Sequence, residues 1–255
     1  MSQEPKVSII IPVLHLKRPL NKARFFMPRY TLPDVLRDLH ANVSLPHEVI
    51  VVCNGQDREL VDFVTANPHI DKYCLNSVNV GVARSWNMGA EMAEGEALCF
   101  VNDDVEIGTG AIEELYRNLN SDPLIGEVGP SGGTWEKDGG QYVTAENPVE
   151  VDQISGYLFL LKRQVYDQAM GFDVEYSPAG FEEIDMSFAV RKLGFKCVVV
   201  PGLPIKHYSH HGVSAQRSEI SYLHKKIDSA ELHQRNREYF LRKWYGGKDV
   251  VSTST

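Results

Sequence analysis

Five short stretches of the chain are almost entirely apolar and β-branched, which is typical of strands covered on both faces of a sheet. They cover residues 7–13, 48–53, 97–101, 154–161 and 196–200. Between them apolar residues recur at helical spacing, at Leu32, Val35, Leu36 and Leu39, at Leu60, Val61 and Val64 after a cap at Asp57, and at Ile112, Leu115 and Leu119. This alternation predicts an α/β fold with a mostly parallel, Rossmann-like sheet flanked by helices.

Two regions do not follow the alternation. Residues 126–148 hold many glycine, proline and polar residues with little periodicity, which predicts an irregular loop. Residues 216–248 predict C-terminal helices, one with Ile220, Leu223 and Ile227 and another with Tyr239, Phe240 and Trp244. We therefore expect one domain over residues 1–215 and a helical extension of it over residues 216–255.

The composition is that of an ordinary soluble globular protein: 255 residues, 43% hydrophobic, with a formal net charge of -8. It excludes a coiled coil, a collagen and a mainly disordered chain, and the acidic balance argues against a nucleic-acid partner. Residues 216–248 are the exception, with 8 Lys+Arg and 4 Asp+Glu. Such a basic, aromatic end predicts peripheral contact with an anionic membrane, and the alternative is a helix packed on the domain.

The cysteines and the N-terminus indicate the compartment. The four cysteines lie far apart, three of them inside apolar runs, so they form neither a disulfide frame nor a zinc site; they are Cys53, Cys74, Cys99 and Cys197. The first residues lack the layout of a signal peptide, and no apolar stretch approaches the ~20 residues that span a bilayer. These observations predict a cytoplasmic protein.

Acidic side chains follow the third strand, in the sequence Asn102-Asp103-Asp104. Ligands of open α/β sheets bind beyond the carboxyl ends of the strands. Two adjacent carboxylates there suit Mg²⁺ or Mn²⁺ carrying a diphosphate. The alternative is an Asx-type turn that leads into the helix starting near Gly110.

A second acidic cluster lies in FEEID, where Phe181, Ile184 and Phe188 predict the buried stripe of a helix. Glu182 and Asp185 then share an exposed face, with Glu183 rotated to another. One of the three carboxylates is a candidate general base, and the alternative is that all three complement the helix dipole. Spacing alone does not choose among the three.

Two further segments carry candidate chemistry. His207, His210 and His211 follow the last strand, and one imidazole completing the coordination of the cation is more economical than a separate zinc site. Gly81 and Gly89 allow close approach of the backbone, and the N-terminus of the helix in this segment is suited to a phosphate, with Trp86 expected in the core.

Taken in order, these segments resemble the family 2 glycosyltransferases of the GT-A fold over roughly residues 6–212. The similarity lies in VSIIIPV, V-x-NG-x-x-D, NVGVARSWNMG, the NDD turn, GYLFLLKR, GFD, FEEID and the PxxxxxH ending at His207. The resemblance implies inverting transfer of a hexosyl or deoxyhexosyl group from a nucleotide-diphosphate donor to an acceptor hydroxyl. It also implies surface polysaccharide or glycoconjugate synthesis on saccharide or lipid-linked acceptors at the inner face of the cytoplasmic membrane.

The resemblance also implies roles for particular residues. Asp104 would hold Mg²⁺ or Mn²⁺, with Asp103 supporting it and His207 as a further ligand. Glu183 falls on the position of the general base, ahead of Glu182 and Asp185. The donor would contact Pro12, Val13, Leu14, Asn54, Gly55, Asp57, Gly81, Arg84, Asn87, Asn102 and Asp103.

The chain departs from the family pattern at four places. Cys53 replaces an aspartate that reads the nucleotide base, Asn102 replaces the first carboxylate of an Asp-x-Asp, and Glu183 stands where aspartate is usual. The insert after the first strand is long, and its Lys17, Arg18, Lys22, Arg24 and Arg29 either touch the diphosphate or acceptor or form a solvated loop.

Two other functions stay open. The departures at Cys53 and Asn102 favour a catalytically inactive nucleotide-sugar-binding or scaffolding module as the alternative. A sugar nucleotidyltransferase is a weaker candidate, because such enzymes carry a glycine-rich loop after the first strand and IPVLHLKRP has no glycine.

Overall fold

The computed structural model describes residues 4–17, 26, 29–55, 57–137, 139–209 and 219–246. Arg18, Lys22 and Arg24 of the insert lie outside the described residues, as do His210 and His211. Lys17 is described, and its Nζ lies 2.6 Å from Glu59 Oε2 at the surface.

The centre of the fold is an eight-stranded sheet in the order β3-β2-β1-β4-β11-β6-β12-β9. The strands are β1 (Val7–Val13), β2 (His47–Asn54), β3 (Lys72–Asn76), β4 (Ala97–Val101), β6 (Ile125–Gly129), β9 (Val149–Val151), β11 (Leu158–Lys162) and β12 (Lys196–Val199). β1, β2, β3 and β4 are mutually parallel, whereas β11 is antiparallel to both of its neighbours. The mostly parallel sheet predicted from the apolar runs is confirmed.

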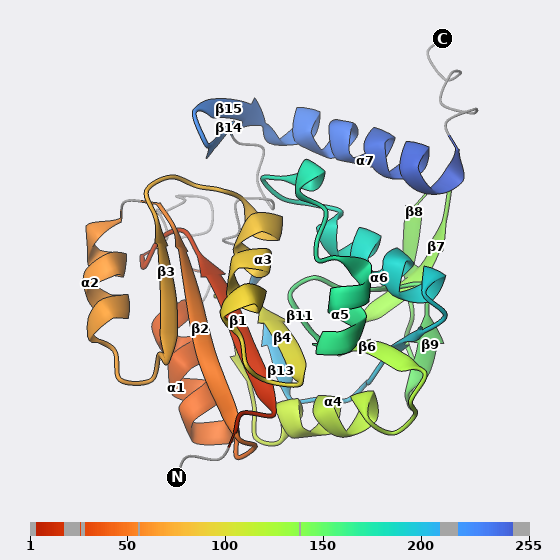
Figure 1. The fold of residues 1–255 in the computed structure, drawn as a ribbon, viewed down its shortest axis with the longest axis horizontal. Helices are drawn as coiled ribbons and strands as arrows, with labels where there is room; N and C mark the ends of the chain where they lie inside the picture. Colours follow the sequence, from red (N-terminus) through yellow and green to blue (C-terminus); the bar gives the residue numbers. More distant parts are fainter. Residues whose placement is uncertain are drawn as a thin grey trace.

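Helices cover both faces of this sheet, as Figure 1 shows. Along β1, Ile9 and Ile11 pack into one hydrophobic core and Ile10 into the other, which explains why the strand has no polar face. The first core is completed by α1 (Leu32–Asn42), α2 (Arg58–Ala66) and α4 (Ala111–Leu119), and the second by α3 (Val82–Met92), α5 (Arg163–Ala169) and α6 (Glu182–Lys192). Trp86 is 1% exposed in the second core, as predicted.

Three small sheets complete the strand set. They are β10-β7-β8, with β7 (Gly132–Glu136), β8 (Gly139–Tyr142) and β10 (Gln153–Ile154), the pair β13 (Ile205–His207) with β5 (Val105–Ile107), and the hairpin of β14 (Glu219–Tyr222) and β15 (Lys225–Asp228). The predicted loop over residues 126–148 is therefore wrong, because that region contains β6, β7 and β8. Its glycines allow close approach of neighbouring strands, and a Cβ at Gly132 of β7 would lie 2.3 Å from the Gln153 carbonyl oxygen of β10. The predicted strand over residues 154–161 is interrupted between β10 and β11.

The predicted helix around Ile220 is also wrong, because residues 219–228 form the β14–β15 hairpin. Ile220 lies opposite Ile227 across the hairpin, so one pair of apolar residues fits both a helical and a two-stranded pattern. Asn79 ties the hairpin to the start of α3, since its carbonyl accepts from the Leu223 amide at 2.8 Å. The hairpin thus lies beside the carboxyl ends of the central strands (Figure 1).

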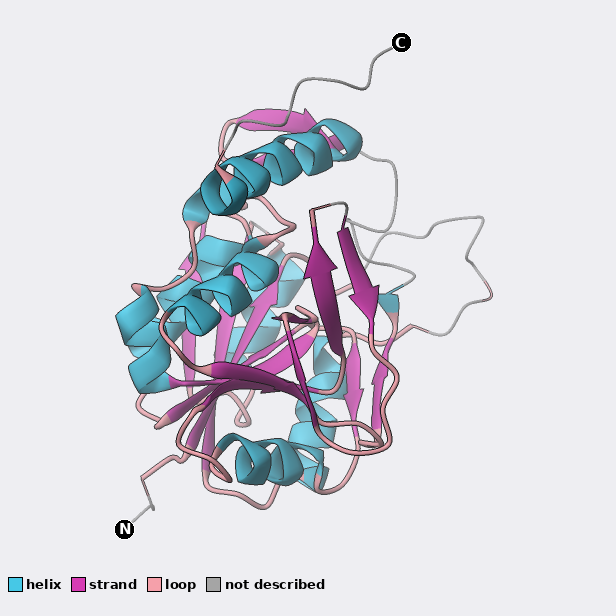
Figure 2. Ribbon diagram, turned by 90° about the vertical axis from the view of Figure 1, so that its right-hand side faces the viewer, coloured by secondary structure: helices cyan, strands magenta, loops and turns pink. Residues whose placement is uncertain are grey.

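The C-terminal helix α7 (Ser229–Tyr245) packs on the domain. Its Phe240 is 0% exposed and contacts Trp135 of β7. Figure 2 shows the strand β7 extending towards α7. Leu232 is also buried, so the apolar face of α7 is used in packing within the chain. No helix within the described ranges is long and apolar enough to span a membrane.

Candidate active site

The ends of β1 and β2 lie together, as expected for the donor side of the site. Leu14 follows β1, and its Cδ1 lies 3.6 Å from where a Cβ on Gly55 would be. Asn54, the last residue of β2, is 5% exposed and donates from Nδ2 to Ser85 Oγ at 2.6 Å, while its Oδ1 has no hydrogen-bond partner among the described residues. Pro12 and Val13 end β1 next to this pair. The structure therefore gathers these predicted donor residues at one edge of the sheet.

Asp57 organises the loop after β1. It caps α2 by accepting from the Leu60 amide at 3.3 Å, and it accepts from the Leu16 amide at 3.1 Å. His15 Nδ1 lies 3.7 Å from the same carboxylate. Burial alone would raise the pKa of Asp57, but the two amides and His15 lower the pKa overall. Asp57 is thus a charged residue that fixes the backbone around the proposed nucleotide site.

The N-terminus of α3 is closed by the chain itself. The Gly81 amide donates to Asn79 Oδ1 at 2.9 Å, and the Val82 amide donates to the Pro178 carbonyl at 2.8 Å. A Cβ on Gly81 would lie 2.9 Å from Pro178 Cα, so glycine is required for this approach. The amides of Gly81 and Val82 therefore already have partners within the chain, and the contact of this helix end with a phosphate stays a prediction.

Two other predicted donor residues on α3 have partners within the chain. The Arg84 guanidinium bonds to the hydroxyl of Tyr222 and lies 5.8 Å from the centre of that ring. Asn87 accepts from the Tyr166 hydroxyl and the Phe172 amide and donates to the Phe172 carbonyl, all at 2.8 to 2.9 Å. Asn87 therefore holds the GFD turn, and its contact with the donor stays a prediction.

The candidate metal ligands meet beyond β4. Asp104 is 3% exposed, and its Oδ1 lies 3.3 Å from His207 Nε2. Pairing of β13 with β5 makes this contact, because His207 lies opposite Val105 and the Tyr208 amide donates to the Asp104 carbonyl at 2.8 Å. The structure thus brings together Asp104 and His207, which lie 103 positions apart in the sequence.

Tyr157 fixes the other side of this pair. Its ring stacks on the His207 ring, with centroids 4.5 Å apart and planes 16° apart. Its carbonyl accepts from the Asn102 amide at 2.9 Å, which places Asn102, and Asp103 after it, in the same turn. Nothing in the sequence distinguished Tyr157 from the strand around it, so sequence reasoning missed this residue.

The candidate base lies at the start of α6, next to the segment that contains Tyr157. Glu183 is half-buried against Gly156, where a Cβ would lie 2.9 Å from Glu183 Cγ. Glu182 is 4% exposed, with Oε2 lacking a partner among the described residues. The predicted exposed face of Glu182 and Asp185 is therefore wrong, and the predicted stripe is replaced by buried Met186 and Val190, with Phe181, Ile184 and Phe188 only half-buried.

Burial raises the pKa of both neighbouring glutamates. The charge of Glu183 adds to the rise at Glu182, whose pKa lies well above its usual range. Glu182 is also the more deeply buried of the two, at 4% exposure, whereas Glu183 is half-buried. Glu183 is therefore the better placed of the two carboxylates to meet an acceptor, with a basicity enhanced by its surroundings.

Asp185 is committed to structural contacts. Its carboxylate accepts from the Tyr176 hydroxyl at 2.9 Å, from Trp244 Nε1 at 2.7 Å and from Lys243 Nζ at 2.8 Å. Two of these donors come from α7, so the face of α6 that was expected in solvent is covered. These contacts make Asp185 a weaker candidate for the base than Glu183, and the choice of the base stays a prediction.

Comparisons with known proteins identify the family of the chain. The family model for glycosyl transferase family 2 matches residues 27–176. A probable N-acetylgalactosaminyltransferase 6 from Caenorhabditis elegans is 23% identical over 203 residues, covering 66% of this chain and 32% of that protein. This chain therefore spans about a third of the length of that relative.

Two solved structures share the fold. GalNAc-T7 in complex with UDP, GalNAc and Mn²⁺ superposes with a TM-score of 0.63 at 15% identity, over 81% of this chain and 44% of that one. A mannosyltransferase from Pyrobaculum calidifontis with GDP-Man and Mn²⁺ gives a TM-score of 0.59 at 15% identity, over 85% and 61%. With the family match over more than half of its length and the GT-A sheet architecture of these structures, the chain belongs to glycosyl transferase family 2.

Proposed function

We propose that this protein is an inverting glycosyltransferase that moves a sugar from a nucleotide-diphosphate donor to an acceptor hydroxyl. The observation that carries the proposal is the arrangement around residues 156–157. Gly156 lies against the candidate base Glu183, and Tyr157 stacks on His207, which lies beside Asp104. One short segment thus joins a group that can accept a proton to a pair suited to hold a diphosphate-bound cation.

The cation proposed for the site is Mg²⁺ or Mn²⁺, held by Asp104 and His207. The buried carboxylate oxygen and the imidazole nitrogen at 3.3 Å are donors that both ions accept. Across the described parts of the chain no cluster of three or more His, Cys, Asp or Glu side chains is suited to a metal. Asp104 and His207 would supply two ligands to a cation whose remaining oxygen ligands would come from the diphosphate, and such a cation would offset charge on the leaving group.

In the proposed reaction the acceptor hydroxyl gives its proton to a carboxylate oxygen of Glu183 while its oxygen attacks the anomeric carbon. The bond from that carbon to the diphosphate oxygen breaks, and the nucleoside diphosphate leaves with the electron pair. A single displacement from the face opposite the leaving group inverts the anomeric centre. Burial of Glu182 raises its pKa, which disfavours a second negative charge beside the base.

The donor is proposed from the relatives. Their names and complexes include N-acetylgalactosamine with UDP and mannose with GDP, so UDP-GalNAc and GDP-mannose head the donor candidates. The chain itself departs from the family pattern on the nucleotide side, at Cys53. The side chain of this cysteine is fully buried among the core residues. Transfer of other hexosyl or deoxyhexosyl groups stays a prediction.

The acceptor is proposed to be a saccharide or a lipid-linked saccharide of surface polysaccharide or glycoconjugate synthesis, in the cytoplasm. Contact with the inner face of the membrane stays a prediction for the C-terminal segment. Since Leu232 and Phe240 are buried, such contact would depend on exposed basic side chains such as Arg237 and Arg242.

The test is a screen of UDP-, GDP- and dTDP-sugars with and without Mn²⁺, by calorimetry and by donor hydrolysis. The proposal expects at least one donor to bind and to be hydrolysed only with the cation. Binding without hydrolysis or transfer to any acceptor in a saccharide panel would favour the inactive binding module, which the replacements at Cys53 and Asn102 motivate. No binding of any donor would contradict both readings.

A further inference from the structure

The turn before α6, the helix that carries Glu183, has an unusual backbone conformation. Gly180 has φ +93° and Phe181 has φ +79°, and these two residues directly precede Glu182 and Glu183. A bulky residue rarely adopts a positive φ without outside constraint. The direction in which α6 starts, and with it the place of Glu183, therefore depends on whatever holds residues 176–181.

Asn236 of α7 holds this turn. Its side chain is buried, at 1% exposure, and its Nδ2 lies 2.7 Å from the Tyr176 carbonyl, 3.1 Å from that of Ala179 and 2.8 Å from that of Gly180. A single side-chain amide group thus donates hydrogen bonds to three carbonyl oxygens of the turn. Without such a donor, three carbonyl oxygens would face one another in a buried place.

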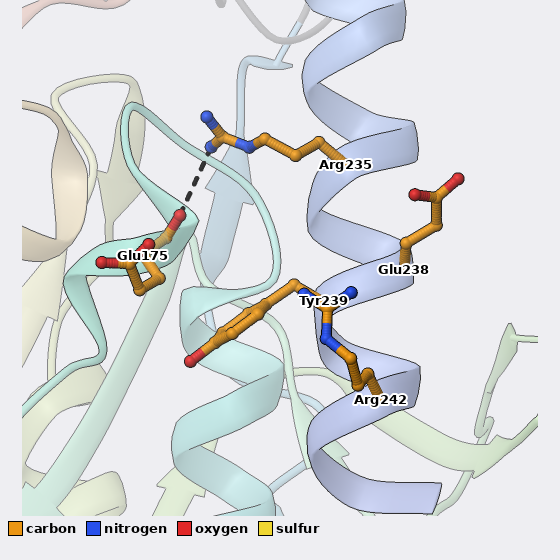
Figure 3. Close-up of a pocket in the computed structure, with 5 residues that line it drawn as sticks. All are labelled: Glu175, Arg235, Glu238, Tyr239 and Arg242. Carbon is orange, nitrogen blue, oxygen red and sulfur yellow. Dashed lines mark hydrogen bonds between the residues drawn. The ribbon is translucent and has the colours of Figure 1, made fainter. Parts of the chain in front are cut away.

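Arg235 fixes the orientation of this amide from the other side. Its guanidinium donates to Asn236 Oδ1, from Nε at 3.1 Å and from Nη2 at 2.8 Å, so the Asn236 nitrogen must face the turn. The same Nη2 lies 2.5 Å from the Ser177 carbonyl and 3.4 Å from the Glu175 carbonyl, the latter contact being drawn in Figure 3. Arg235 thereby lines a surface pocket of about 300 Å³ with Glu175, Glu238, Tyr239 and Arg242.

We propose that Asn236 is a positioning residue for catalysis, which acts by fixing the turn at residues 176–181 and through it the carboxylate of Glu183. This rests on the proposed function, in which Glu183 is the base. The match to the family model ends at residue 176, so α7 supplies this support from outside the matched region. The helix α7, in the segment for which the sequence predicted membrane contact, thus supports catalysis through its buried side chains.

The experiment compares Asn236→Asp and Asn236→Ala with Leu232→Ala in the full-length protein. Aspartate has nearly the same side-chain volume as asparagine, so Asn236→Asp makes no cavity. It replaces the donating NH₂ group by a carboxylate oxygen, which faces the carbonyl oxygens of the turn and cannot donate to them. Leu232 is as buried on the same helix, at 3% exposure, and its apolar side chain cannot bond to the turn, so Leu232→Ala controls for loss of packing. The measurements are hydrogen exchange of a peptide covering residues 176–186, donor affinity with Mn²⁺, and kcat for transfer.

For Asn236→Asp and Asn236→Ala we expect faster exchange in that peptide, kcat reduced by about tenfold or more, and donor Kd within about twofold. Leu232→Ala should lower the Tm and leave kcat within about threefold. Wild-type exchange and kcat in both Asn236 variants would overturn the proposal, as would loss of kcat and donor affinity together in all three variants. Full activity of Glu183→Gln would instead contradict the proposed base, while the exchange rates would still report whether Asn236 holds the turn.

Discussion

Glu127 gives a sharp prediction about pH and stability. It lies on β6 between β11 and β12, is 0% exposed, and accepts from the Cys197 thiol, whose Sγ is 3.1 Å from Oε2. Burial raises the pKa of Glu127 from 4.5 to about 7, the Ser187 and Cys197 hydrogen bonds oppose this rise, and the charge of Glu183 adds to it. The folded state therefore favours the protonated carboxyl.

The consequence follows from linkage. A carboxyl with a raised pKa in the folded state contributes stability that is fully present below pH 4.5 and is lost as pH rises through about 7. Between pH 5 and pH 8 this loss amounts to about 2–3 kcal/mol for a group with these two pKa values. Glu127→Gln has no proton to lose, so its free energy of unfolding relative to wild type should rise by that amount over this interval.

Urea unfolding at pH 5, 6, 7 and 8 measures this difference directly. A constant offset between the proteins, from imperfect packing of the amide, does not affect the slope. Glu150→Gln, at an exposed position on β9, is the control and should give a flat difference. A difference for Glu127→Gln that changes by less than about 0.5 kcal/mol between pH 5 and pH 8 would refute the reasoning.

Two further predictions concern the site itself. Asp104→Ala should abolish the part of nucleotide affinity that depends on Mn²⁺, because it removes the carboxylate beside His207, and calorimetry with and without the cation checks this. An unchanged Mn²⁺-dependent nucleotide affinity would show that the cation does not bind at Asp104. Gly81→Ala should destabilise the protein by about 1–3 kcal/mol, because the new Cβ would lie 2.9 Å from Pro178 at a φ of +85°, and an unaltered Tm would contradict this.

The strands were the most predictable part of the fold. Ile9, Ile10 and Ile11 are all buried, so a strand covered on both faces appears in the sequence as one continuous apolar run. The glycine-rich strands β6 and β7 were not predicted, because glycine is permissive in many conformations and here allows close packing of neighbours that are distant in sequence.

The sequence predicted individual residues of the site better than the contacts among them. Asp104 and His207 were identified by their places after strands, and the structure brings them to 3.3 Å. The distinct roles of Glu182, Glu183 and Asp185 depend on what covers α6, namely Gly156 on one side and α7 on another. Such tertiary contacts are absent from helical spacing, which is also why Tyr157 and Asn236 gave no signal.

The most direct test of the account is transfer by Glu183→Gln beside Glu182→Gln, with the donor identified by the screen. Because Glu183 accepts the proton in the proposed reaction, its replacement should lower kcat by about 10²–10⁴-fold while donor Kd stays within about twofold. Burial raises the pKa of Glu182 and so disfavours a charge there, and its glutamine variant should transfer within about threefold of wild type. Normal turnover by Glu183→Gln, or an equal loss in both variants, would contradict the assignment of Glu183 as the base.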